Sequence, residues 1–398
     1  MLQIIYYILF TINVIYAFHF ATPFIIGLWK KKKEPLKPKR NCKFAILIPA
    51  RNEELVIENL LDSLIHQNYP YEKYKIYVLI NHCTDATKQI AYNKCVDIIN
   101  CPDSVKSKGD VLKYAFSKLQ KESIDAYLIF DADNVVHPNF LKFMNQSYQN
   151  GNAVAQGFRD SKNSRSNWLS GCYSIFYYIQ NVFFHTRKNC NISAALSGTG
   201  LMISKRMIDD YGYPMTTLLE DLEYSAFSIT HNVPIDFVAN AIIYDEQPDQ
   251  FRTSWKQRKR WTTGAYQCLL KYWRLLFKGS THLLSRLDLF YIFFSPLLQV
   301  LTCVVGCINV IYVIFKYGFL ESLSHGILML LIAYIAICLF AIFVVKYNGK
   351  KPEQMKKAIL LFPIFLSTWI PIQFICLFKG VDEWEPIQHK ENVRLKDI

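Results

Sequence analysis

The stretch Ala126-Tyr127-Leu128-Ile129-Phe130-Asp131-Ala132-Asp133-Asn134 predicts how the middle of the chain folds. Its apolar half is typical of a buried strand, and two carboxylates separated by one residue follow it. Alternate residues of an extended chain share a face, so Asp131 and Asp133 can present their oxygens to one point. Mg²⁺ and Mn²⁺ prefer such ligands. A solvated turn is the alternative, because Asp and Asn are ordinary turn residues.

Strand and helix patterns alternate along the chain before this stretch. Apolar runs at 44–48, 76–80 and 96–99 predict strands, and periodic stretches at 84–92 and 111–119 predict helices between them. This alternation predicts an α/β fold with a mostly parallel sheet flanked by helices. In such sheets ligands bind beyond the carboxyl ends of the strands.

Polar residues lie where these predicted strands end. Pro49, Arg51 and Glu53 follow the first strand, Asp85 follows the second, and Lys108 stands just before a helix. Free backbone N–H groups at a helix start, together with a lysine, favour a phosphate. Helix capping is an alternative for Asp85, and a first-turn carboxylate is one for Glu53. Their common place at one sheet edge favours a nucleotide site.

The apolar residues, 52% of the 398, are concentrated at the two ends of the chain. No charged residue occurs between Leu2 and Trp29, a length that can cross a bilayer core of ~30 Å, and we expect a retained anchor. Lys30 to Lys33 follow it and predict that the middle of the chain is cytoplasmic. Uncharged runs at 289–315, 327–345 and 358–378 are each long enough to span.

The last of these runs leaves an open question. Pro363 and Pro371 interrupt it, so the sequence does not decide between a full crossing and a re-entrant or broken segment. Trp168 to Phe184 is also uncharged, but it is at the short limit for crossing, and we expect a helix that lines a groove or lies on the membrane surface. The predicted divisions are 1–29 (anchor), 30–43 (basic linker), 44–261 (catalytic domain), 262–284 (amphipathic interfacial helix), 285–378 (membrane helices) and 379–398 (tail).

The net charge of +13 does not require nucleic acid as a partner. The sequence has no RNA-recognition signature, zinc-finger spacing or basic zipper, whereas anionic lipids and a pyrophosphate account for the same basicity. The 11 cysteines have no zinc-ligand spacing, and we expect free thiols.

Further motifs complete a pattern: Ser197-Gly198-Thr199-Gly200, Glu220-Asp221 and Gln257-Arg258-Lys259-Arg260-Trp261. Together with Ile48 to Glu53, Asn81 to Asp85, Lys108-Gly109 and Asp131-Ala132-Asp133, they resemble the membrane-bound family-two glycosyltransferases of the GT-A fold. Within that family the order and spacing are similar to those of the cellulose, chitin, hyaluronan and poly-N-acetylglucosamine synthases. The resemblance covers about residues 44–261.

The resemblance implies a role for each matching residue. Asp221 would be the general base, with Glu220 and Arg260 beside it in the catalytic group, and Asp133 the principal ligand of Mg²⁺ or Mn²⁺, with Asp131 nearby. Helix N-terminal charge is the alternative for Glu220-Asp221. The donor-binding residues would be Pro49, Arg51, Glu53, Asp85, Lys108 and Asp131, and the acceptor-binding residues Gly198, Gln257 and Trp261. A membrane-interface anchor is an additional role for Trp261.

The function that this pattern predicts is an inverting, metal-dependent transfer of sugar from a UDP-sugar to a growing β-linked polysaccharide at the cytoplasmic face of the plasma membrane. Transfer of one sugar to a lipid acceptor is an alternative, and a catalytically silent nucleotide-binding scaffold is one from another class. Expected partners are the donor, a polysaccharide or lipid acceptor and membrane lipids, with a homo-oligomer or accessory export subunit left open. The sequence does not identify the sugar, because selectivity depends on pocket shape.

Overall fold

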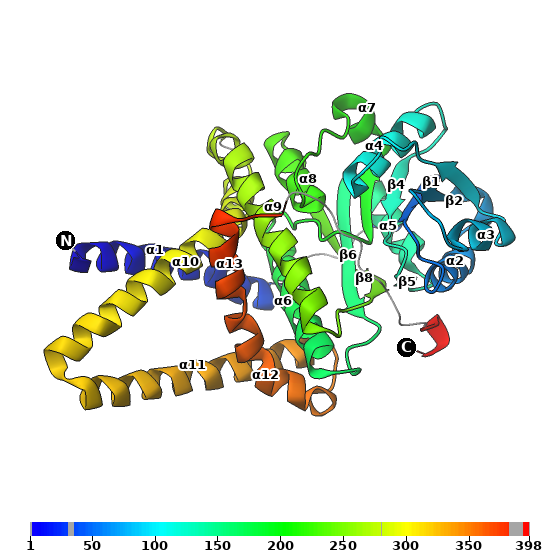
Figure 1. Ribbon diagram of the computed structural model, residues 1–398. Coiled ribbons are helices and arrows are strands. Elements are labelled where there is room, and N and C mark those ends of the chain that lie inside the picture. Colours follow the sequence, from blue (N-terminus) through cyan, green and yellow to red (C-terminus); the bar gives the residue numbers. More distant parts are fainter. Residues whose placement is uncertain (1, 31–35, 280, 382–392, 398) are drawn as a thin grey trace.

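A computed structural model describes residues 2–30, 36–279, 281–381 and 393–397 of the chain (Figure 1). Its centre is one eight-stranded sheet with the strand order β3-β2-β1-β4-β7-β6-β8-β5. The strands are β1 (Phe44–Ala50), β2 (Tyr74–Ile80), β3 (Asp97–Asn100), β4 (Ala126–Ile129), β5 (Val135–Val136), β6 (Val154–Ser161), β7 (Leu201–Ser204) and β8 (Ile235–Asp245).

The first half of the sheet is parallel, as predicted. β1 pairs with β2 and β4, and β2 pairs with β3, all in parallel. β7 then enters antiparallel between β4 and β6, and β5 pairs antiparallel with β8. The predicted α/β fold with a mostly parallel sheet is therefore confirmed, and the carboxyl ends of β1, β2 and β4 meet at one edge.

Alternating side chains of β1 supply two different cores. Ala45 and Leu47 face the layer that contains α4, whereas Ile46 and Ile48 face the layer that contains α2. Because both faces are covered, β1 has apolar residues at consecutive positions instead of an alternating pattern. The shorter helices around the sheet are α2 (Ile57–Ile65), α3 (Thr87–Asn93), α4 (Lys108–Leu119), α5 (Phe140–Gln149), α7 (Lys205–Tyr211) and α8 (Glu220–Thr230).

Two long helices form the base of this domain. In α6 (Trp168–Asn189), which Asn167 caps, more than half of the side chains are buried, and it is not among the helices apolar enough to span a bilayer. α9 (Phe251–Phe277) is one continuous helix. It joins the motif Gln257 to Trp261 to the stretch predicted as a separate interfacial helix. The Tyr173 hydroxyl of α6 lies 2.9 Å from Ser254 Oγ of α9.

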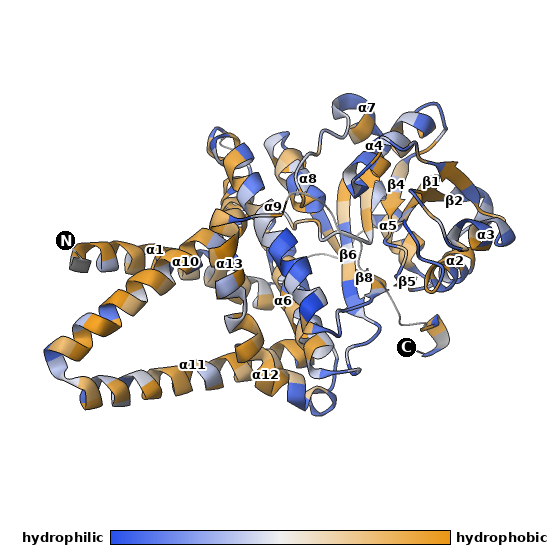
Figure 2. Ribbon diagram, viewed as in Figure 1, coloured by the Kyte–Doolittle hydropathy of each residue, from blue (hydrophilic) through white to orange (hydrophobic). Residues whose placement is uncertain are grey.

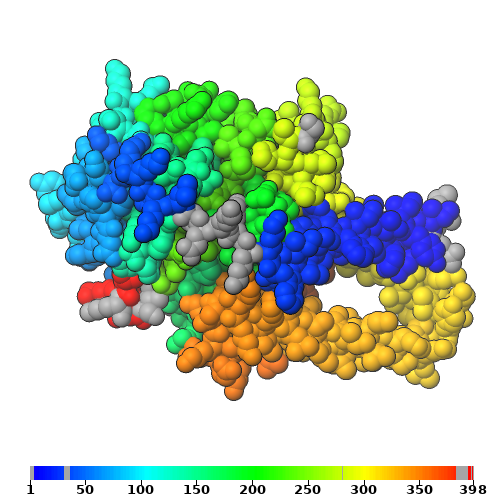
Figure 3. All heavy atoms as spheres, turned by 180° about the vertical axis from the view of Figure 1, so that it is seen from behind, coloured from blue at the N-terminus to red at the C-terminus, as the bar shows by residue number. Residues whose placement is uncertain are grey.

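In the part of the chain that the structure describes, four apolar helical stretches are long enough to cross a membrane, one near the N-terminus and three near the C-terminus, as predicted. They are α1 (Leu2–Trp29), α10 (Leu283–Tyr317), α11 (Phe319–Tyr347) and the pair α12 (Lys356–Ser367) with α13 (Trp369–Phe378). Figures 1 and 2 show α1, α10 and α11 projecting from one side of the domain as apolar arms. The view from behind in Figure 3 shows the same arms standing clear of the body.

The last apolar stretch is divided into two helices, which together are long enough to cross a membrane. α12 ends and α13 begins around Thr368. Before the break, Lys350 Nζ lies 2.6 Å from Asp160 Oδ2 of the domain, and after it the Val381 amide donates to Thr263 Oγ1 of α9. α13 runs alongside α9 (Figure 1). Both ends of this stretch therefore contact the domain, unlike the extended hairpin of α10 and α11.

A buried ionic cluster fixes the arms to the domain. Arg187 of α6 is fully buried, and its Nε lies 3.1 Å from Asp288 Oδ2 of α10. His19 Nε2 of α1 lies 2.7 Å from the other oxygen of Asp288. Loss of one partner from a buried pair costs about 3–5 kcal/mol, so this cluster holds the three helices in one arrangement.

Candidate active site

The two acidic residues of the motif follow β4 but differ in their surroundings. Asp131 has a side chain that is 33% exposed, and its backbone amide donates to Thr199 Oγ1 over 3.0 Å. Asp133 is buried, and the Glu246 amide donates to its Oδ2 over 3.3 Å. Asn134 then donates to Asp245 Oδ1 at the end of β8. The end of β8 therefore contacts Asp133 and Asn134, whereas Thr199 fixes the backbone of Asp131.

Lys108 connects several of the predicted site residues. Its Nζ lies 2.5 Å from Asp131 Oδ1, 3.8 Å from Glu220 Oε1 and 2.8 Å from the Gly198 carbonyl oxygen. Ser107 caps the N-terminus of α4, and Lys108 is the first residue of that helix. Burial alone would lower the pKa of Lys108, but the carboxylates of Asp131 and Glu220 outweigh it and raise that pKa. The lysine stays charged and neutralises an otherwise acidic site.

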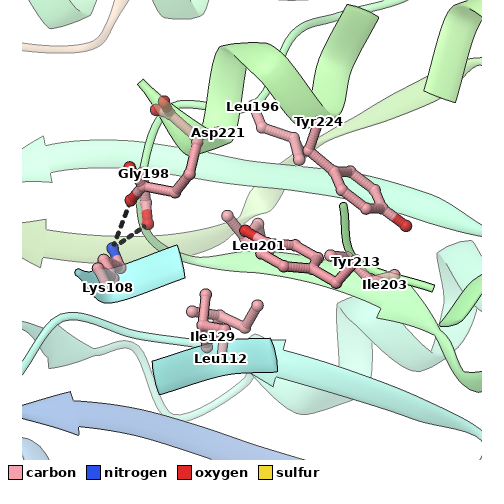
Figure 4. Close-up of a pocket in the computed structure, with 11 residues that line it drawn as sticks. Lys108, Leu112, Ile129, Leu196, Gly198, Leu201, Ile203, Tyr213, Asp221 and Tyr224 are labelled. Carbon is pink, nitrogen blue, oxygen red and sulfur yellow. Dashed lines mark hydrogen bonds and ion pairs between the residues drawn. The ribbon is translucent and has the colours of Figure 1, made fainter. Parts of the chain in front are cut away.

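Asp221 lies in the first turn of α8 beside Gly198. A Cβ atom on Gly198, which has a φ of +85°, would stand 3.5 Å from Asp221 Oδ2. Figure 4 shows Asp221 and Lys108 lining one cavity with Gly198 between them. Burial, and then the neighbouring Glu220 carboxylate, raise the pKa of Asp221 to about 6. A carboxylate with that pKa can accept a proton near neutral pH.

Close packing of α9 sets the position of α8. A Cβ on Gly264 would lie 2.6 Å from the Leu219 Cβ, so only glycine lets the two helices approach this closely. Arg260 Nη1 donates to the Leu218 carbonyl oxygen over 3.4 Å, and its charge lowers the pKa of Asp221 in part. The predicted catalytic residues Glu220, Asp221 and Arg260 are therefore brought together by one helix contact.

The predicted donor-binding loops at β1 and β2 are joined by hydrogen bonds. The Glu54 amide donates to Asp85 Oδ2 over 3.1 Å, and the Glu53 amide donates to Thr87 Oγ1 over 2.8 Å. Burial would raise the pKa of Asp85, but hydrogen bonds from Thr87 and Glu54 outweigh it and lower that pKa. Pro49 lies within β1 and Arg51 directly after it. The Thr87 amide, at the start of α3, donates to Asp85 Oδ1 over 3.0 Å, so Asp85 contacts both loops.

Two of the three predicted acceptor-binding residues, Gln257 and Trp261, lie on α9, whereas Gly198 lies beside Asp221 and Lys108. Trp261 stacks on Phe176 of α6 and on Trp369 of α13, with ring centroids 6.4 Å and 6.1 Å away. Gln257, one turn earlier, has a buried Oε1 that no described residue contacts by a hydrogen bond. The indole is therefore part of an aromatic group at the base of the domain, where both predicted roles of Trp261 can coexist.

Arg159 of β6 was missed in the sequence. Its guanidinium forms an ion pair with Asp245 of β8, donates from Nη1 to the Ser197 carbonyl oxygen over 2.6 Å, and lies 4.0 Å from the Tyr177 ring centroid. Arg159 therefore connects the loop that contains Ser197 and Gly198 to β6. A signal existed, because Arg159 and Asp245 are charged residues within or at the end of strands that are otherwise mostly apolar.

The site fits a hard divalent cation by its donor chemistry. Within the described residues no group of three or more His, Cys, Asp or Glu side chains could enclose a metal. Mg²⁺ needs no such cage, because it is typically held by one or two carboxylates and by substrate phosphates. Asp131 and Asp133 provide two carboxylates, with Lys108 beside them to compensate charge. This arrangement suits a cation that binds together with a nucleoside diphosphate.

Comparisons with known proteins identify the family of the chain. The sequence model described as "Glycosyltransferase like family 2" matches residues 40–264. The chain is similar to the probable glycosyltransferase YdaM of Bacillus subtilis, with 26% identity over 89% of this chain and 85% of the relative. It is 25% identical to the beta-monoglucosyldiacylglycerol synthase of Nostoc over 59% of this chain and 51% of that relative.

Two further relatives widen the range of related activities. The poly-beta-1,6-N-acetyl-D-glucosamine synthase of Staphylococcus epidermidis is 21% identical over 64% of this chain and 61% of the relative. Among solved structures, a mannosyltransferase of Pyrobaculum calidifontis in complex with GDP-Man and Mn²⁺ has a TM-score of 0.63 at 16% identity, over 93% of this chain and 99% of that one. That likeness shows the fold, which is GT-A. With more than half of its length matched, the chain belongs to the family described as glycosyltransferase like family 2 and is a glycosyltransferase.

Proposed function

We propose that this enzyme transfers a sugar from a UDP-sugar to an acceptor hydroxyl at the cytoplasmic surface of the membrane, with inversion at the anomeric carbon. The observation that carries the proposal is the cluster of Lys108, Asp131, Gly198 and Asp221 at one edge of the sheet. Asp221 accepts the proton of the acceptor hydroxyl as its oxygen attacks the anomeric carbon. Direct displacement on an α-linked donor gives a β-linked product.

Positive groups on the other side of the cluster bind the donor. Lys108 and Arg260 face the position where negative charge develops on the leaving diphosphate, and fixed charges of this kind usually supply the largest catalytic term. Asp133 and Asp131 would hold Mg²⁺ or Mn²⁺, and a bound cation adds further stabilisation of that charge. Glu53, Arg51, Pro49 and Asp85 form the loop pair suited to the nucleoside.

The membrane part favours a lipid as the acceptor. α1, α10 and α11 stand apart as arms, while α12 and α13 return to the domain (Figures 1 and 3). Such an arrangement offers lateral access from the bilayer to the base of the domain. Polymer extension is the second candidate, because glutamine at position 257 accompanies synthases that extend a chain repeatedly in the group that the motif resembles.

Product analysis tests the proposed function. Membranes containing the full chain are incubated with a panel of UDP-sugars and Mn²⁺, and the products are analysed by mass spectrometry. We expect a lipid heavier by one sugar residue, absent with the Asp221→Asn variant. A ladder of products separated by one sugar would instead support the polymer, and no UDP release with any donor would support the silent scaffold.

The pKa of Asp221 predicts how activity depends on pH. A general base must be deprotonated, so kcat/KM should fall about tenfold for each pH unit below about 6 and be level above it. Glu220→Gln removes a neighbouring negative charge that raises this pKa, so the acid limb should move to lower pH. Initial rates of UDP release between about pH 4.5 and about pH 8 measure both profiles. If Glu220→Gln leaves the acid limb of the kcat/KM profile at the same pH, a group other than Asp221 causes that limb.

A further inference from the structure

Helices α9 and α13 meet in a seam that contains unpaired polar atoms. Arg258 and Thr262 lie one turn apart on α9, and Trp369 and Gln373 lie one turn apart on α13; we call these four residues the α9–α13 seam. Arg258 Nη2, Thr262 Oγ1, Trp369 Nε1 and Gln373 Oε1 are all buried and have no hydrogen-bond partner among the residues that the structure describes. Each such atom costs about 1–3 kcal/mol, so four along one helix contact point to a polar ligand.

The charge of Arg258 indicates what kind of ligand this is. The residue is 0% exposed, its Nη1 donates to Thr368 Oγ1 over 2.6 Å, and its Nε donates to the Ser254 carbonyl oxygen over 3.4 Å. Within the described parts of the chain, no carboxylate forms an ion pair with it. A guanidinium stays charged in proteins, and a buried charge is costly unless an opposite charge compensates it. The ligand should therefore be an anion.

Aromatic rings form the walls around this guanidinium. Its central carbon lies 5.0 Å from the ring centroid of Phe365 and 5.5 Å from that of Trp369, which itself stacks on Trp261. Cation–π contacts of this kind stabilise the guanidinium but do not neutralise it. They also leave Nη2 and the Trp369 Nε1 as two donors on neighbouring groups. A pair of donors suits the tetrahedral oxygens of a phosphate.

The seam lies next to the apolar arms of the protein. It belongs to the base of the domain, from which the apolar arms α1, α10 and α11 project (Figures 1 and 2). Gln373 Nε2 donates to Gln299 Oε1 of α10 over 3.1 Å, which joins the seam to one of these arms. If the arms cross the hydrocarbon core, the base lies in the headgroup layer.

We propose that the α9–α13 seam binds the phosphate of a membrane lipid headgroup, with Arg258 and Trp369 as the donors. Arg258 contacts Thr368 between α12 and α13, whereas Arg260 of the same helix contacts Leu218 beside the catalytic cluster. The two arginines thus serve different anions. The seam adjoins Trp261 through the stacked Trp369, so the bound lipid lies next to the predicted acceptor site.

Lipid titration of the delipidated full chain in detergent tests this proposal. The probes are a short-chain phosphatidic acid, the diacylglycerol with the same tails, and inorganic phosphate, with thermal unfolding and native mass spectrometry as readouts. We expect one phosphatidic acid bound per chain and a higher Tm, and no such effect of the diacylglycerol. Equal binding of the diacylglycerol would overturn the proposal. Equal affinity for inorganic phosphate would show that the bound phosphate does not come from a lipid.

Substitutions locate the bound phosphate. Arg258→Gln should weaken phosphatidic acid binding at least tenfold, whereas Arg252→Gln, on the exposed part of the same helix, should leave it unchanged. Trp369→Phe replaces the indole by another aromatic ring that has no N–H donor, so it should weaken phosphatidic acid binding several-fold in a protein that still folds. If Trp369→Phe and Arg258→Gln both bind like the unaltered chain, the seam is not the lipid site. Because binding is measured without a sugar donor, this result is independent of the transfer reaction.

Discussion

Asp221→Asn is expected to lower the rate of sugar transfer by about 10²- to 10⁴-fold, the usual contribution of a general base. The asparagine has nearly the same shape, so its Oδ1 can still accept the hydrogen bond that the Leu222 amide donates to Asp221 over 2.8 Å. It cannot take up the acceptor proton. UDP release from the purified full chain, measured with saturating donor and Mn²⁺, gives the rate. Affinity for the donor should change little, because the substitution leaves Lys108 and Asp131 in place.

A matched substitution separates this effect from a general loss of acidic charge. Asp210 lies on the exposed surface of α7, where it pairs with Arg206 over 3.2 Å. Asp210→Asn should therefore transfer sugar at the rate of the unaltered chain. If Asp221→Asn retains more than about a tenth of that rate, which is far above the range for a lost base, the proton must go to another group.

Asp133→Ala is expected to lower the Mn²⁺-dependent affinity for a UDP-sugar by about 100-fold, a free-energy loss of about 3 kcal/mol. Two carboxylates follow β4, and Asp131 is already engaged by Lys108 at 2.5 Å. Asp133 therefore has to provide most of the negative charge that a cation needs. Calorimetric titration of the donor, with Mn²⁺ and then with a chelator, measures the metal-dependent part of the affinity.

Two comparisons make this second result specific to the metal. The unaltered chain with a chelator should bind the donor about as weakly as Asp133→Ala does with Mn²⁺. Asp103→Ala, at a side chain that is fully exposed, should bind like the unaltered chain. Undiminished Mn²⁺-dependent affinity in Asp133→Ala would show that this carboxylate is not a metal ligand.

Local patterns were enough to predict the strands that carry the site. The five apolar residues before Asp131 are buried in β4 or directly after it, and the polar segments at Arg51 and Asp85 follow β1 and β2 as expected. These predictions succeed because a strand buried on both faces needs a continuous apolar run. The four apolar helical stretches were likewise readable from length and composition.

Contacts between distant segments were not readable. Lys108 and Gly198 are 90 residues apart, and nothing in either segment indicates that the lysine donates to that carbonyl oxygen. The ion pair of Arg159 with Asp245 depends on the parallel pairing of β6 with β8, which periodicity does not specify. Similarly, the hydroxyl of Thr368, at the break between α12 and α13, accepts a hydrogen bond from Arg258 of α9, which is 110 residues away. Tertiary packing, which no single stretch encodes, decides each of these.

The cluster of His19, Arg187 and Asp288 also determines the sequence of events during biosynthesis. α1 leaves the ribosome first, but its partners in the cluster follow 168 and 269 residues later, as the numbering of the chain shows. α6 can contact α1 before α10 is translated, because Arg187 also donates to the Phe20 carbonyl oxygen over 3.3 Å and Asn189 donates to the Gly27 carbonyl oxygen over 2.8 Å. The carboxylate that compensates the buried guanidinium comes only with α10, so a chain that stops before residue 288 would hold Arg187 against α1 without its counterion.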